Sequence, residues 1–155
     1  MALGRKDWIR ALSAHPARVL NALADQLTVN CEIKLISLPQ AGLGLLTLTD
    51  GAFHEPYYLG EFPLSVCHIE IDFPDGRRAE GGAQVLADDA EFARSLAILD
   101  AILASRLPGW EQVSAHIESG ALQRSEEERR RCAILAATRV NFDLLSNTEE
   151  DDGEN

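Results

Sequence analysis

A strictly alternating stretch at residues 65–73 constrains the fold more than any other part of this chain. Two sets of residues alternate along it. The apolar set is Cys67, Ile69, Ile71 and Phe73, and the mostly polar set is Val66, His68, Glu70 and Asp72. Successive side chains of a strand point to opposite faces, so this pattern predicts a half-buried strand. Asp75-Gly76 then favours a hairpin turn. Residues 77–86 are predicted to return as a partner strand, bulged or bent at Gly81-Gly82.

A helix is predicted directly after this hairpin. Asp88 and Glu91 are spaced like a capping box, with acidic groups at the positive end of the helix dipole. One helical stripe follows them, formed by Phe92, Leu96, Leu99 and Leu103. Asp88 and Asp89 could instead act as an acid/base pair, but we favour helix capping.

The rest of the chain predicts an α+β fold, in which an antiparallel sheet of about five strands has helices at both termini packed on one face. The additional strands are expected at residues 29–35, 42–49 and 57–59, the second being central because it is apolar on both faces. Helices are expected at 5–14, from Pro16 onward, at 110–119 ending at Gly120, and behind Ser125. We expect one domain over residues 1–147 and a disordered acidic tail over 148–155.

Charge and composition exclude several classes of protein. The formal net charge is −11, and five of the last seven residues are acidic. Nucleic-acid binders usually carry a basic stripe, so we expect no nucleic-acid partner. No run approaches the roughly 20 apolar residues of a membrane span, and three dispersed cysteines do not suggest a disulfide framework. A cytoplasmic protein is therefore expected.

No motif predicts a catalytic residue, a cofactor or a metal site. Cys67 and His68 are neighbours on a predicted strand and point to opposite faces, so a structural role is favoured for Cys67. The other histidines lack ligand-like spacing. Gly42-Leu43-Gly44 lacks the strand–loop–helix context of a dinucleotide-binding loop. Between Lys34 and Arg77 the chain contains no Lys or Arg, so side-chain charge could not hold a phosphate there.

Several short motifs, in order, resemble the PhnG family, the small subunit of the bacterial carbon–phosphorus lyase core complex. They are Trp8-x-x-x-Leu12, Gly42-Leu43, Gly60-Glu61, Asp75-Gly76, Val85-Leu86, Leu99-Asp100-Ala101 and the closing Ala137-Thr138-Arg139-Val140-Asn141-Phe142. Each motif is weak alone, whereas their order and spacing together are fairly specific. The resemblance implies a subunit that works with PhnH, PhnI and PhnJ in phosphonate metabolism. In that family PhnG, PhnH and PhnI, together with PhnL, are implicated in transferring a phosphonate onto the ribose of a nucleoside triphosphate in place of adenine, and PhnJ later cleaves the product.

The chain departs from the family at polar positions. Ser37, Thr49 and Val66 stand where the family tends to carry arginines, and Asp88 and Phe92 replace an Arg and a His of the family's G-R-D-x-x-H-A motif. These departures agree with the absence of Lys and Arg between Lys34 and Arg77, a stretch that we call the cation-free window. They indicate that packing residues are kept while groups that would grip a polyphosphate are missing.

Three hypotheses follow. The first is a binding or scaffold subunit of a phosphonate-processing complex with PhnI-, PhnH- and PhnJ-like partners. The second is an active contributor to the transferase step, in which Arg77, Arg78 or Arg94 binds substrate. The third is a stand-alone homodimer unrelated to phosphonates. The predicted interface residues are Trp8, Tyr57, Tyr58, Arg139, Asn141 and Phe142, although the aromatic residues among them could equally belong to the core.

Overall fold

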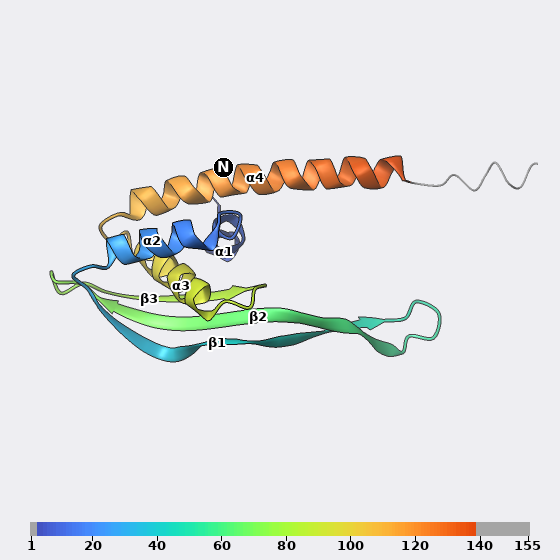
Figure 1. Cartoon of the computed structure of the whole chain (residues 1–155), viewed down its shortest axis with the longest axis horizontal. Helices are drawn as coiled ribbons and strands as arrows, with labels where there is room; N and C mark the ends of the chain where they lie inside the picture. Colours follow the sequence, from blue (N-terminus) through green and yellow to red (C-terminus); the bar gives the residue numbers. More distant parts are fainter. Residues whose placement is uncertain (1–2, 139–155) are drawn as a thin grey trace, which may run out of the picture.

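The computed structural model describes residues 3–138, which form an α+β fold with four helices and three strands (Figure 1). The elements follow the chain as α1 (Arg5–Leu12), α2 (Ala17–Leu27), β1 (Glu32–Thr49), β2 (Pro56–Asp72), β3 (Arg78–Val85), α3 (Ala90–Ala104) and α4 (Trp110–Ala137). All four helices lie on one side of the sheet, as the sequence predicts. No helix within 3–138 combines the length and apolar character needed to cross a bilayer.

The sheet is antiparallel in the order β1-β2-β3, so the prediction of about five strands was wrong. The segments 29–35 and 42–49 merge into β1, and 57–59 and 65–73 merge into β2. Proline is tolerated on edge strands and at bulges. Pro39 lies in edge strand β1 at a register shift, and Pro63 lies where β2 has only β1 as a neighbour. The prediction that residues 42–49 form a central strand was also wrong, because they belong to β1, which is an edge strand.

The core lies between the sheet and α3. The alternation predicted for β2 is confirmed, because Cys67, Ile69, Ile71 and Phe73 are all buried. Helix α3 packs on β2 and β3 with one side and on the other three helices with the other, so most of its residues are buried. It is capped by Asp89, one residue later than the predicted Asp88, whose Oδ1 accepts a hydrogen bond of 2.8 Å from the Phe92 N–H.

Gly120 does not end a helix, because α4 runs without interruption through this position. A Cβ atom on Gly120 would lie 2.1 Å from the Ala11 carbonyl oxygen, so the glycine lets the end of α1 contact the backbone of α4. The predicted short helix at 110–119 and the helix behind Ser125 are therefore parts of one element.

Gly81 has a similar role and does not form the predicted bulge. The β2–β3 register is continuous across both glycines, from Ser65↔Val85 to Asp72↔Arg78. A Cβ atom on Gly81 would lie 2.0 Å from the Ala97 carbonyl oxygen and 2.6 Å from the Ala101 nitrogen. The backbone of α3 therefore lies directly on β3 at this position.

We expect Gly81→Ala to lower the free energy of unfolding by about 3 kcal/mol, because a methyl group there must push α3 off the sheet. Gly82→Ala is the matched control, since its Cβ would meet no heavy atom closer than 3.8 Å. Urea denaturation followed by circular dichroism measures both. Equal unfolding free energies for the two variants would show that the close approach at Gly81 is unimportant.

Candidate functional site

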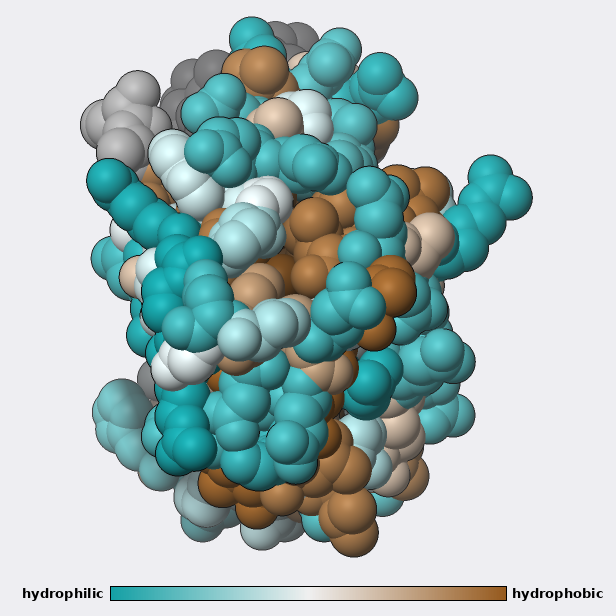
Figure 2. Space-filling view, turned by 90° about the vertical axis from the view of Figure 1, so that its left-hand side faces the viewer, coloured by the Kyte–Doolittle hydropathy of each residue, from teal (hydrophilic) through white to brown (hydrophobic). Residues whose placement is uncertain are grey.

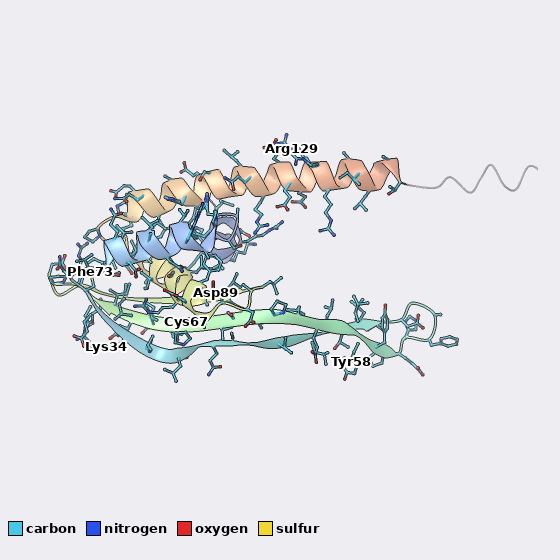
Figure 3. The ribbon with its side chains drawn as sticks, in the orientation of Figure 1. Lys34, Tyr58, Cys67, Phe73, Asp89 and Arg129 are labelled. Carbon is cyan, nitrogen blue, oxygen red and sulfur yellow. The ribbon has the colours of Figure 1, made fainter. Side chains whose placement is uncertain are left out.

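The most unusual surface is a two-stranded ribbon that projects beyond the folded body. Strand β3 pairs only with Ser65–Asp72 of β2. Among the described residues 3–138, no third strand pairs with residues 42–64, which comprise parts of β1 and β2 and the turn between them. We call residues 42–64 the β1–β2 ribbon. It extends in the same direction as the second half of α4 (Figure 1). Figure 3 places Tyr58 on it, far from the helices, whereas Cys67 lies beneath α3.

Large apolar side chains are concentrated on this ribbon. Of the 17 exposed large hydrophobic residues within 3–138, eight belong to it, namely Leu43, Leu45, Leu46, Leu48, Phe53, Tyr57, Tyr58 and Leu59. Leu35, Ile36 and Leu38 continue the exposed set toward the base of β1. Viewed from the end that carries the β2–β3 turn, hydrophobic residues also gather along the lower edge, where the sheet lies (Figure 2). Monomeric proteins rarely expose such concentrated apolar surface.

Both faces of the ribbon are apolar. Leu43 pairs with Pro63, and Gly44 pairs with Phe62 on the opposite face. The Phe62 ring lies over Gly44, where a Cβ atom would be only 2.4 Å from the ring. Gly44 is thus explained by contact with an aromatic ring and belongs to no nucleotide-binding loop. The ribbon therefore offers a partner two apolar faces as well as open strand edges.

The turn at the end of the ribbon is held by local hydrogen bonds. Asp50 Oδ2 accepts a bond of 2.8 Å from the Phe53 N–H, and this contact lowers the pKa of the Asp50 carboxyl group. The Asp50 N–H donates to the Glu55 carbonyl oxygen at 2.9 Å. Phe53 is 82% exposed. A turn held by these hydrogen bonds thus presents an aromatic ring to the outside.

The arginines predicted to bind substrate do not meet in one place. Arg77 pairs with Asp75 at 2.7 Å and Arg78 with Asp72 at 2.9 Å, both where β3 begins. Arg94 lies in the second turn of α3, which begins after the other end of β3. Its charge partly opposes the burial that raises the pKa of the Cys67 thiol. A substrate role for these residues stays a prediction.

The predicted interface residues have different environments. Trp8 is half-buried against the core, and its indole N–H donates to the Leu3 carbonyl oxygen at 3.1 Å. Tyr57 and Tyr58 are exposed on the ribbon. Arg139, Asn141 and Phe142 lie outside the described residues, as does the tail at 148–155. Within 3–138, no three His, Cys, Asp or Glu side chains are grouped to hold a metal ion.

Asp100 is the important residue that the sequence analysis did not assign. Its carboxylate is almost fully buried and accepts hydrogen bonds from Arg5 Nη2 at 2.7 Å, Arg5 Nε at 3.1 Å and the Gly82 N–H at 3.1 Å. Arg5 Nη2 also donates to the Glu80 carbonyl oxygen at 3.3 Å, and its pairing with Asp100 raises the pKa of Arg5. The free edge of β3 is thus covered by two side chains. A lone carboxylate within the apolar run of α3 was the signal in the sequence.

Comparison with known proteins identifies the family. The family model described as phosphonate metabolism protein PhnG matches residues 4–147. The chain belongs to the PhnG family. It is also similar to the alpha-D-ribose 1-methylphosphonate 5-triphosphate synthase subunit PhnG of Rhizobium meliloti (strain 1021), with 27% identity over 146 residues that cover 94% of this chain and 90% of the relative. The resemblance drawn from the short motifs is confirmed, and phosphonate metabolism is the process of this family.

We expect Asp100→Ala to lower the free energy of unfolding by about 2–3 kcal/mol, because it leaves the Gly82 N–H without an acceptor and removes a charge-assisted pair. Asp75→Ala is the matched control, since it removes an arginine–carboxylate pair that is exposed to solvent. Urea denaturation should show a much smaller midpoint shift for the control. Equal shifts would contradict a special role for Asp100 at the edge of β3.

Proposed function

We propose that the chain is a binding subunit of a phosphonate-processing complex and that the β1–β2 ribbon is the surface by which it joins that complex. The observation that carries this proposal is the concentration of exposed apolar side chains on a ribbon that projects from a well-packed body. An isolated two-stranded ribbon is at best marginally stable in water, and an uncovered edge invites pairing with another chain. A partner that covers the faces and also pairs with or covers an open edge would relieve both costs.

The comparisons support a complex rather than an isolated protein. The similar Rhizobium meliloti protein is named as a subunit of a synthase that makes α-D-ribose 1-methylphosphonate 5-triphosphate. We propose the same process here, namely support of the transfer of a phosphonate onto the ribose of a nucleoside triphosphate. PhnI-, PhnH- and PhnJ-like proteins are the proposed partners, and we assign the ribbon to the PhnI-like one.

The chemistry of the ribbon fits a protein partner better than a phosphorylated substrate. The ribbon lies wholly within the window that lacks Lys and Arg, and it carries Asp50, Glu55 and Glu61. Interface centres are depleted in charge and enriched in aromatic residues, as at Phe53, Tyr57 and Tyr58. In this proposal the ribbon positions the subunit and takes no part in the chemical step.

We expect Leu43→Asp to weaken binding of a purified PhnI-like partner at least about 30-fold, because a carboxylate would be buried in an apolar contact. Leu122→Asp on α4 is the matched control, since Leu122 is 72% exposed and Leu43 is 69% exposed. The dissociation constants can be measured by biolayer interferometry. Urea denaturation of each isolated variant should give wild-type stability.

Two outcomes would contradict this proposal. One is normal binding of Leu43→Asp together with lost binding of Leu122→Asp, which would move the interface to α4. The other is a stable homodimer of the wild-type chain at low micromolar concentration by light scattering, with Leu43→Asp monomeric and no binding of the PhnI-like partner. That result would favour a stand-alone protein.

A further inference from the structure

A groove between α1, α4 and the end of β3 gathers basic side chains that are far apart in the sequence. It has a volume of about 510 Å³, and its polar lining includes Lys6, Arg10, Ser13, Gln84 and Arg124. No carboxylate lines it among the described residues. Pockets for small molecules commonly measure about 300–1,000 Å³, so the groove is large enough for one. Three cations in one concavity are notable in a chain whose formal net charge is −11.

The positive charge continues along α4. An adjoining groove of about 370 Å³ shares Arg10 and Arg124 and adds Arg131, together with Glu127 and Glu128. Arg10 and Glu128 are 3.5 Å apart, and both side chains are about two-thirds exposed. Exposed ion pairs of this kind are weak, so a multiply charged anion can displace Glu128 from Arg10.

Arg124 fixes one wall of the groove. Its Nη2 donates to the Ser13 carbonyl oxygen at 2.9 Å, which ties α4 to the end of α1, and its Nη1 pairs with Glu127 at 3.2 Å. Most of its donors are therefore used within the protein. Lys6 is exposed and makes no ion pair within residues 3–138, and Arg10 has only the weak contact to Glu128. These two side chains are the ones available to an incoming anion.

We infer that this groove binds the polyphosphate group of a nucleotide-like molecule, with Lys6 and Arg10 as the groups that contact phosphate. The inference rests on the proposed function, because a phosphonate-processing complex of this kind handles triphosphate esters, as the name of the similar synthase subunit states. Guanidinium and ammonium groups are the usual partners of phosphate oxygens. Ile9 and the exposed Leu86 provide an apolar wall for the organic part of the molecule.

The groove also differs from the sites expected from the sequence. Arg77 and Arg78 are each held by a neighbouring carboxylate, at the other end of β3 from Gln84. Lys6 and Arg10 lie outside the cation-free window. The loss of arginine from the sheet is thus compatible with an anion site built on the helices.

The test is isothermal titration calorimetry of the full chain with inorganic triphosphate at low, fixed ionic strength. The variant is Lys6→Gln/Arg10→Gln, and the matched control is Arg18→Gln, which removes an exposed basic residue of α2 outside the groove. We expect saturable binding to the wild type, at least tenfold weaker binding to the double variant, and less than a twofold change for the control. Urea denaturation confirms that the double variant is folded.

Absence of saturable binding to the wild type, or equal affinity of the double variant, would overturn the inference. So would competition in which a peptide of residues 146–155 displaces triphosphate at equal concentration, because the groove would then be a site for acidic peptide. The double variant should still bind the PhnI-like partner. Loss of triphosphate binding with retained partner binding supports the groove, whereas failure of Leu43→Asp to affect the partner counts against the ribbon proposal alone.

Discussion

The direct contact between the backbones of α3 and β3 determines how the rest of the molecule is arranged. It requires glycine at position 81, because any side chain there would enter the Ala97–Ala101 turn of α3. The same turn carries Asp100, which accepts a hydrogen bond from the Gly82 N–H and two from Arg5. One helix turn thus closes the core, covers the free edge of β3 and anchors α1. The body of the protein is a small core built around this contact.

The extent of this contact also explains where the molecule is left open. Strand β3 has eight residues and β2 has 17. About half of β2 therefore extends past the end of β3, which is the strand that lies directly against α3. The other three helices pack on α3, so their position depends on where α3 lies. The remaining parts of β1 and β2 form the β1–β2 ribbon, whose apolar side chains are left exposed by the described residues 3–138. In our proposal the body and the ribbon therefore have separate tasks, which are stability and recognition.

Local patterns in the sequence predicted the central elements well. The alternation from Cys67 to Phe73 identified the buried face of β2, and the Asp-Gly turn and the helix stripe gave the order of β2, β3 and α3. Pro39 and Pro63 lie in the gaps that were predicted between separate strands, and Gly120 was predicted to end a helix; none of the three interrupts its element. Each is tolerated for a tertiary reason, namely an edge strand, a missing neighbour strand or a close helix contact, and a single sequence does not show these reasons.

The candidate sites were harder to predict for a related reason. Tyr57 and Tyr58 were predicted to be possible anchors because aromatic residues are enriched at the centres of interfaces, whereas the exposure of Leu43 and Leu45 depends on where β3 ends. Arg124 lies more than 100 residues from Arg10 in the chain, and only the packing of α4 on α1 brings them together. Asp100 was recognised as part of a family motif, but only the fold brings its hydrogen-bond partners Arg5 and Gly82 next to it.

The central claim is that the β1–β2 ribbon becomes buried when the protein joins its complex. Amide hydrogen exchange measured by mass spectrometry, on the isolated chain and on the chain bound to a PhnI-like partner, tests this most directly. We expect slower exchange in the complex across residues 42–64, with little change in β3 and α3, whose amides are already protected in the core. Unchanged exchange across 42–64 in a stable complex, with new protection confined to α2 or α4, would contradict the claim.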